Sequence, residues 1–400
     1  MKKVKKRRIK KSVIFIFLVL LLIIVLGVFG YKHYLDNKNK KEVKKEEPKE
    51  VEKQPKEYSL NMIMVGDALI HYGLYADAKT SKGGYDFKPM LSNLKPIIQY
   101  YDLAYYNQET VLGGTKLGLS SYPMFNSPQE VGDAFIDCGF NLVSLATNHT
   151  MDKGEVGVTN SVNYWKKQKK NGIIATGQWT SQEERDTPHI YMKNGITYAF
   201  FSYTMWNNGL RTPVGKDYLS NEYSQEKAKE DIEKVRDKVD VVMVAMHWGT
   251  EYSMGVSAAQ DKEAKYLSEL GVDLIIGAHP HVVEPVEYIN NNKTFVIYSL
   301  GNFISDQNGN EKLTGLMMEV TIKKIVNPDD TTKVTIESPK AQLVYTAASR
   351  GGGYNSNFKL YTYPKLTSKQ LPNHENYYKQ FKEVVSDRYK DLEWGLSGEW

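Results

Sequence analysis

The chain has 400 residues, of which 41% are hydrophobic, so it is long enough to bury one large or two modest cores. Its net charge of +5 is uneven: residues 1–11 hold eight Lys and Arg, and residues 32–57 hold nine Lys against seven acids. The residues from 58 onward therefore carry a net charge of −5, which argues against nucleic acid as the partner of the main domain. Cys138 is the single cysteine, so an intrachain disulfide is excluded.

The N-terminal end is typical of a membrane anchor. The stretch from Val13 to Tyr31 is uncharged, and at about 1.5 Å per residue it is long enough to cross a bilayer. Because Lys and Arg that flank a membrane helix remain on its cytoplasmic side, we expect a cytoplasmic tail over 1–11 and a signal-anchor helix over 12–32. A cleaved signal peptide is the alternative, for which Gly27-Val-Phe-Gly30 is a poor cleavage site. Both interpretations place the rest of the chain outside the cytoplasm, as in a single-pass cell-membrane protein.

A charged segment separates the anchor from the main domain. Residues 33–57 are rich in Lys and Glu and contain Pro48 and Pro55, so we expect an extracytoplasmic linker. A charged helical stalk is the alternative, which the two prolines limit. We expect a main domain over 58–350 and a C-terminal extension over 351–400.

From residue 58 short apolar runs alternate with amphipathic stretches. The predicted strands are 60–65, 103–106, 142–146, 196–202, 241–246, 273–276 and 295–300. The predicted helices lie near 87–100, 128–139, 155–171, 224–238, 258–270 and 375–393. Residues 316–326 and 333–344 alternate apolar and polar side chains, as in an antiparallel hairpin. The alternation predicts an α/β domain with a mixed or largely parallel sheet.

Polar side chains follow nearly every predicted strand. The candidate ligands are Asp67, Glu109, Asn148, His149, His247, His279 and His281. Sites in open α/β sheets form at the carboxyl ends of the strands, so we expect these side chains to converge. One Asp, one Glu, one Asn and four His suit two divalent ions bridged by an oxygen ligand, and Mn, Fe and Zn fit the set about equally.

Each of these positions has a plainer interpretation. Pro280 between His279 and His281 restricts the backbone and favours a paired ligand, but the same residues could form an ordinary surface loop. His71 follows Asp67 by four residues and either reaches the site or lies on its rim. Asp152 and Glu251 follow a histidine by three and four residues, and either orient an imidazole or begin a helix.

The segment 206–223 is rich in Asn, Gly and aromatic residues. We expect it to be either a substrate-facing lid, with Arg211 and Lys216 available to an anionic polymer, or a disordered surface loop. Asn302, after the last predicted strand of the α/β part, is expected to orient a ligand or to contact substrate. The chain has no Walker A loop, no GxGxxG and no GxSxG elbow, which argues against nucleotide-loop and serine-hydrolase chemistry.

Seven motifs occur in one order between about residues 60 and 307. They are Val65-Gly-Asp67, Asn107-Gln-Glu109, Phe125-Asn-Ser-Pro128, Gly139 to His149 with Asp152 and Gly154, His247-Trp-Gly-Thr-Glu-Tyr252, Gly277-Ala-His-Pro-His-Val282 and Tyr298-Ser-Leu-Gly-Asn-Phe303. Through these motifs the chain resembles the CapA (PgsA-type) capsule-synthesis family, which is similar in fold to the calcineurin-like metallophosphatases.

The resemblance implies a metallophosphatase-like α/β/β/α sandwich with mixed sheets. It also implies Asp67, Glu109, Asn148, His247, His279 and His281 as metal ligands, and His149 as the acid beside Asp152. It further implies a role with an anionic cell-surface polymer, such as capsule or poly-γ-glutamate, and with membrane synthase subunits as partners.

Three positions depart from the expected pattern. The metallophosphatase motif opens with Asp-x-His, whereas Ala68 and Leu69 follow Asp67 here; Glu109 replaces an Asp, and Glu284 stands where the family pattern has Gln. The leading hypothesis is a metal-dependent phosphoesterase-like hydrolase. The alternatives are a non-catalytic polymer-binding or synthase-assembly factor, and a metal-dependent amide hydrolase of poly-γ-glutamate.

Overall fold

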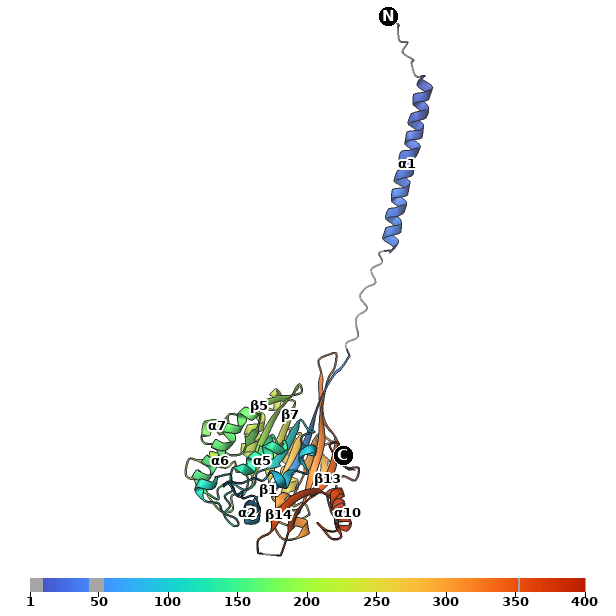
Figure 1. Cartoon of the computed structure of the whole chain (residues 1–400). Helices are drawn as coiled ribbons and strands as arrows, with labels where there is room; N and C mark the ends of the chain where they lie inside the picture. Colours follow the sequence, from blue (N-terminus) through green and yellow to red (C-terminus); the bar gives the residue numbers. More distant parts are fainter. Residues whose placement is uncertain (1–9, 43–53, 352, 400) are drawn as a thin grey trace. The chain divides into compact units, whose positions relative to one another are not determined.

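The computed structural model describes residues 10–42, 54–351 and 353–399, and the chain divides into two units, Met1–Gln54 and Pro55–Trp400. Nearly all of the expected basic tail over 1–11, and residues 43–53 of the expected linker, lie outside the described residues. The first unit holds helix α1 (Lys11–Glu42), the one described helix that is long and apolar enough to cross a membrane (Figure 1). The helix continues past the predicted end at residue 32 because neither Gly nor Pro occurs between residue 32 and Pro48.

The second unit contains two β-sheets. The first sheet is built from β1 (Lys56–Leu69), β2 (Leu103–Asn107), β3 (Leu142–Ser144), β4 (Ile174–Thr176), β11 (Asn302–Ser305), β12 (Thr314–Val326), β13 (Thr332–Ser349), β14 (Ser356–Thr362) and β15 (Glu393–Trp394). Its order is β14-β13-β12-β1-β2-β3-β4, with β11 paired to β1 and β15 to β13. The sheet is mixed, because β1 runs parallel to β2 and β11 but antiparallel to β12.

The second sheet has the order β5-β6-β7-β8-β10-β9. Its strands are β5 (Ile190–Lys193), β6 (Ile196–Thr204), β7 (Val241–His247), β8 (Leu274–Ala278), β9 (Val286–Ile289) and β10 (Thr294–Ile297). Strands β6, β7, β8 and β10 are parallel neighbours, and the two edge strands are antiparallel.

Apolar side chains pack between the two sheets and on both outer faces. In β1, Met62 and Met64 belong to the core between the sheets, whereas Ile63 and Val65 belong to the cluster on the outer face, as the two-residue period of a strand requires. Met243 of β7, in the second sheet, belongs to the same core.

Helices cover the two outer faces (Figure 1). They are α2 (Tyr72–Asp77), α3 (Lys88–Leu91), α4 (Lys95–Ile98), α5 (Glu130–Cys138), α6 (Gly154–Gln168), α7 (Gln182–Asp186), α8 (Gln225–Glu233) and α9 (Ala258–Glu269). The last helix, α10 (His374–Val385), instead packs against the core between the sheets. Phe135 of α5 stacks on Tyr106 at the first sheet, and Leu267 of α9 packs with Val244 at the second. The predicted α/β/β/α sandwich with mixed sheets is confirmed.

Some helix bounds differ from the prediction. The helix expected near 87–100 is two short helices, because Pro89 and Pro96 each begin a new one. The last helix ends at Val385 rather than 393, where the chain turns so that Arg388 can bond to Asp261 and Glu287. The helix near 224–238 stops at Glu233.

The predicted hairpin is confirmed as β12 and β13, and the residues after 350 add to it. Strand β14 pairs with β13, and Phe381 and Val385 of α10 are part of the core between the sheets. The segment 351–399, apart from residue 352, therefore packs with the same compact unit. Its standing as a separate extension stays a prediction.

Candidate metal centre

The expected ligands lie at the carboxyl ends of parallel strands in both sheets. In the strand register Asp67 is opposite Asn107 and Asn302, and His247 is opposite Ala278. Glu109 follows β2 by two residues, and His279 directly follows β8. The parallel strands thus deliver these side chains to a common edge, as the sequence pattern predicts.

Two glycines allow the backbone to close around this edge. A Cβ on Gly66 would lie 1.8 Å from the carbonyl oxygen of Gly301, and a Cβ on Gly277 would lie 1.8 Å from that of Tyr298. Neither position can carry a side chain without moving the neighbouring backbone. These close approaches hold β1 and β8 against the turn that leads to Asn302.

One group of ligands comprises Asp67, Glu109 and His281, all of them buried. The Nδ1 atom of His281 lies 3.2 Å from Asp67 Oδ2 and 3.1 Å from Asn302 Oδ1, so it must carry the proton toward these two acceptors. The Nε2 atom then presents its lone pair, and it lies 3.6 Å from Glu109 Oε1. The Asn302 amide nitrogen donates to the backbone oxygen of Lys312, which fixes the orientation of its carbonyl toward His281.

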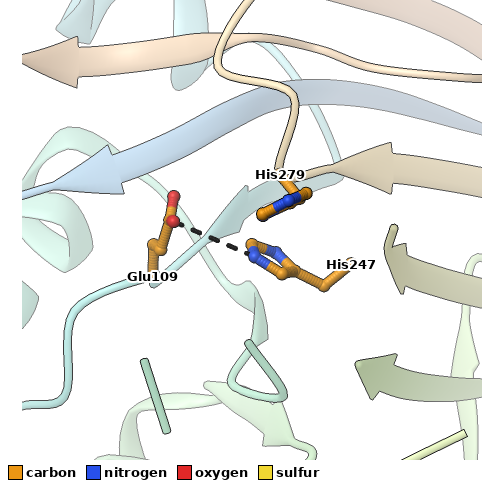
Figure 2. Close-up of side chains that lie close together, drawn as sticks. All are labelled: Glu109, His247 and His279. Carbon is orange, nitrogen blue, oxygen red and sulfur yellow. Dashed lines mark ion pairs between the residues drawn. The ribbon is translucent and has the colours of Figure 1, made fainter. Parts of the chain in front are cut away.

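The second group comprises Glu109, His247 and His279. Figure 2 shows the two imidazole rings beside the Glu109 carboxylate, with His247 Nε2 3.8 Å from Glu109 Oε1. The two ring centroids are 4.8 Å apart. Asn148 joins this group, because its Oδ1 lies 3.0 Å from His247 Nε2. Glu109 is therefore common to both groups.

Several buried polar atoms at this centre have no hydrogen-bond partner among the described residues. They include both carboxylate oxygens of Glu109 and the Nδ1 atom of His279. Leaving such atoms unpaired costs about 1–3 kcal/mol each, and more for a charged group. In each group the donor atoms lie within 4.8 Å of one another. Mixed imidazole, carboxylate and amide donors of this kind fit divalent ions, so the residues present are suited to hold metal.

The electrostatic environment keeps the imidazoles neutral. Burial lowers the pKa of His247 well below its usual value, and the neighbouring His279 and His281 lower it further. Burial, followed by the charges of His281 and His149, lowers the pKa of His279 to about 3. A metal-binding histidine must be unprotonated, so both rings are in the required state at neutral pH. Burial and the Asp67 carboxylate raise the pKa of Glu109, a shift that a bound cation would oppose.

A histidine–aspartate pair lies beside the ligands. His149 Nδ1 is 2.7 Å from Asp152 Oδ2, which also accepts a hydrogen bond from the backbone N–H of Phe125 at 2.6 Å. The Phe125 ring meets the His149 ring edge-on, with centroids 4.7 Å apart. Asp152 thus fixes the ring orientation and leaves the Nε2 atom of His149 available for proton transfer.

Two further candidates are His71 and Glu251. The His71 Nδ1 atom contacts the backbone oxygen of Leu69 at 3.1 Å, and His71 belongs to none of the metal-binding groups found among the described residues. Glu251 is exposed and forms a third such group with His279 and His281.

The segment 206–223 is anchored rather than loose. Leu219 packs with Val158 of α6, and Arg211 is exposed. The Lys216 ammonium is paired with the Glu155 carboxylate at 2.6 Å, and the expectation that Lys216 is available to an anionic polymer stays a prediction.

Two contacts at the centre were not predicted from the sequence. Asn107 donates from Nδ2 to Asp67 Oδ1 at 2.8 Å and accepts from Ser144 Oγ at 2.6 Å, which orients Asp67. The same rule of strand ends could have identified Asn107, because it is the last residue of β2. The Trp206 ring stands edge-on to His279, with centroids 4.9 Å apart, a contact between separate loops that no local pattern reveals.

The chain is similar in sequence to known proteins over more than half of its length. Residues 61–307 match the family described as bacterial capsule synthesis protein PGA_cap. PGA biosynthesis protein CapA of Bacillus subtilis (strain 168) is 27% identical over 275 residues, which cover 66% of this chain and 68% of that protein. Capsule biosynthesis protein CapA of Bacillus anthracis is 26% identical over 260 residues, which cover 62% of this chain and 60% of that protein.

Solved structures also match this chain, at low sequence identity. A phosphatase from Mycoplasma pneumoniae is 15% identical, covers 70% of this chain and 93% of its own, and has a TM-score of 0.42. A Staphylococcus aureus protein described as a 5′-nucleotidase is 14% identical, with coverages of 81% and 58% and a TM-score of 0.43. Because both scores are below 0.5, the fold assignment rests on the sheet topology described above. The family match spans more than half of the chain and confirms the resemblance seen in the seven motifs: the chain belongs to the bacterial capsule synthesis protein PGA_cap family.

Proposed function

We propose that this protein is a membrane-anchored, extracytoplasmic metal-dependent hydrolase of the phosphoesterase type that acts on an anionic cell-surface polymer or its precursor. The observation that carries the proposal is Glu109, a buried carboxylate with no hydrogen-bond partner among the described residues, shared between two groups of imidazole ligands. Its role would lie in synthesis, export or trimming of capsule or poly-γ-glutamate, in keeping with the names of the Bacillus relatives.

The centre would hold two divalent ions, Mn, Fe or Zn. Asp67, Glu109 and His281 would hold one, and Glu109, His247 and His279, with Asn148, would hold the other. When bound, such ions supply Lewis acids that polarise a phosphoryl oxygen and stabilise the charge that develops on it.

The protein's own acid would be His149. Asp152 accepts a hydrogen bond from the Nδ1–H of His149, and the proton on Nε2 would be the one delivered to the leaving oxygen. His149 is only 5% exposed and Phe125 covers its edge, which excludes bulk water from this proton. The Trp206 ring meets the His279 ring edge-on and would shield that histidine from bulk water.

The proposed location follows from α1 and the basic residues before it. Eight Lys and Arg precede the apolar stretch, so the N-terminus would remain in the cytoplasm and the second unit would lie outside. Its partners would be the membrane, the anionic polymer and membrane synthase subunits. Since the residues from 58 onward carry a net charge of −5, an anionic polymer would be recognised by the metal ions and local cations such as Arg211 rather than by overall charge.

The test compares the full chain in detergent with a His149→Ala variant and with His189→Ala as a control, because His189 is exposed and outside the centre. Each protein is supplied with Mn, and phosphate release from phosphoesters is measured. We expect His149→Ala to lower turnover about 10²–10⁴-fold while metal content stays unchanged. Equal turnover in His149→Ala and wild type would contradict the assigned acid.

The same experiment separates the two alternatives. Shortening of added poly-γ-glutamate without phosphate release would identify an amide hydrolase. If neither reaction occurs, and cells carrying His149→Ala still make polymer, the protein would be an assembly factor.

A further inference from the structure

The loop after β7 is tied to the histidine pair by its backbone. The Trp248 N–H donates to the carbonyl oxygen of Ala278 at 3.1 Å, and the Tyr252 N–H donates to that of Pro280 at 2.8 Å. Glu251 lies between these two attachment points, so its backbone is fixed over the loop that carries His279 and His281.

The side chain after Glu251 is fixed as well. The centroid of the Tyr252 ring lies 6.0 Å from that of the His281 ring and 4.7 Å from the Lys312 ammonium. The backbone of Tyr252 has φ of +66°, which a non-glycine residue adopts only where its surroundings hold it there. The loop is therefore built to keep one conformation beside His281.

Glu251 itself reaches both halves of the metal centre. One carboxylate oxygen lies within 4.8 Å of ligand nitrogens of His279 and of His281, and these two histidines belong to different groups. Glu251 is the exposed member, whereas the other ligands are buried. Its carboxylate consequently approaches the centre from the solvent side.

The two groups differ in the number of their ligands. The group with His247 and His279 has the Asn148 amide oxygen as a fourth donor. In the group with His281 the Asn302 amide oxygen faces the Nδ1 atom, so beside the free Nε2 atom this group has the carboxylates of Asp67 and Glu109. Divalent Zn takes four ligands, and Mn takes up to six, so a metal ion held by the group with His281 would have at least one open coordination position. His71 joins none of these groups among the described residues.

We propose that Glu251 is a further metal ligand, which joins the group of Asp67, Glu109 and His281 from the solvent side through its place beside His281. This inference rests on the proposed function, because it requires that the centre binds metal. It predicts two unequal sites: a tight one with four buried ligands, and a weaker one whose affinity depends on an exposed carboxylate.

The test is a Mn²⁺ titration of the metal-free full chain in detergent, with free metal measured by its electron paramagnetic resonance signal. Three variants are compared with wild type: Glu251→Gln, His71→Asn, and Glu230→Gln as a matched control, since Glu230 is exposed on α8 outside the centre. We expect two binding steps in wild type, and we expect Glu251→Gln to weaken the weaker step about 10-fold or more while the tighter step stays within about 2-fold. His71→Asn and Glu230→Gln should match wild type.

The outcomes separate this inference from the proposed function. Two unchanged steps in Glu251→Gln would overturn the role of Glu251 and leave the metal centre standing. Weakening by His71→Asn instead would assign the position to His71. No Mn²⁺ binding by wild type would overturn the proposed function itself. Equal thermal unfolding of the metal-free proteins would verify that the exposed substitution leaves the fold intact.

Discussion

Glu109 and Glu284 are two buried carboxyl groups in different surroundings. Both are at most 1% exposed, and each has at least one oxygen without a hydrogen-bond partner among the described residues. Burial raises the pKa of both. By burial alone the two residues would be indistinguishable.

Their neighbours differ. Glu109 faces His247 at 3.8 Å and His281 at 3.6 Å and takes part in two potential metal-binding groups. Glu284 accepts a hydrogen bond from Gln260 Nε2 at 2.7 Å and takes part in none of the groups found among the described residues. A buried carboxylate therefore indicates a metal ligand only where neutral nitrogen donors surround the same space. At Glu284 a neutral amide would serve as well.

The largest expected effect is that of Glu109→Gln. Because Glu109 is shared by both groups, we expect the loss of one carboxylate to weaken binding of both metal ions by at least about 100-fold. Elemental analysis and Mn²⁺ titration measure this loss. Glu284→Gln is the matched control, since it makes the same chemical change at a buried site without histidine neighbours, and it should retain both ions. Retention of both ions by Glu109→Gln would show that the histidine neighbours of Glu109 do not make it a metal ligand.

The second prediction concerns pH and Glu284. Burial raises the pKa of Glu284 to about 8 from 4.5, so between these values the folded protein holds one more proton than the unfolded chain. The free energy of unfolding should consequently fall as pH rises, by about 1.4 kcal/mol per pH unit from this group. Glu284→Gln removes this titrating group. The free energy of unfolding of the variant minus that of wild type should therefore be larger at pH 8 than at pH 5.

Urea unfolding of both metal-free proteins at several pH values between 5 and 8 measures this difference. A difference between wild type and Glu284→Gln that stays constant with pH would show that the Glu284 carboxyl titrates normally. It would also mean that burial has no electrostatic cost at this position.

The smallest effect is expected at an exposed charge. Arg211 lies on the segment 206–223 and is exposed, so its attraction for an anionic polymer is screened by solvent and salt. We expect Arg211→Ala to weaken binding of poly-γ-glutamate by less than about 1 kcal/mol, and the loss should shrink as salt is added. Unchanged binding and turnover at low salt would remove this segment from the substrate site.

The ends of the long buried strands could be predicted from sequence. Asp67 and His247 follow apolar runs whose period and length identify buried strands, and parallel strands then bring their ends together. The short strand β4 escaped prediction because it is only three residues long and half-buried, so it has no clear period. Strand β11 escaped because its place is set by pairing with β1, far away in the chain.

The contacts that orient the ligands were harder to predict than the ligands themselves. Asn302 reaches His281 through a turn whose shape depends on Gly301 lying against Gly66. Trp206 meets His279 only because the loop after β6 and the loop after β8 fold toward each other across the end of β7. Such contacts depend on tertiary packing, which a local sequence pattern does not contain.

The central claim is that the buried cluster holds two metal ions. The most direct measurement is the metal content of the purified full chain in detergent after exposure to Mn, Fe or Zn, beside a His279→Ala, His281→Ala double variant. The account predicts close to two ions per wild-type chain and their loss from a variant that circular dichroism shows to be folded. A wild-type chain that binds none of these metals when each is supplied would contradict it.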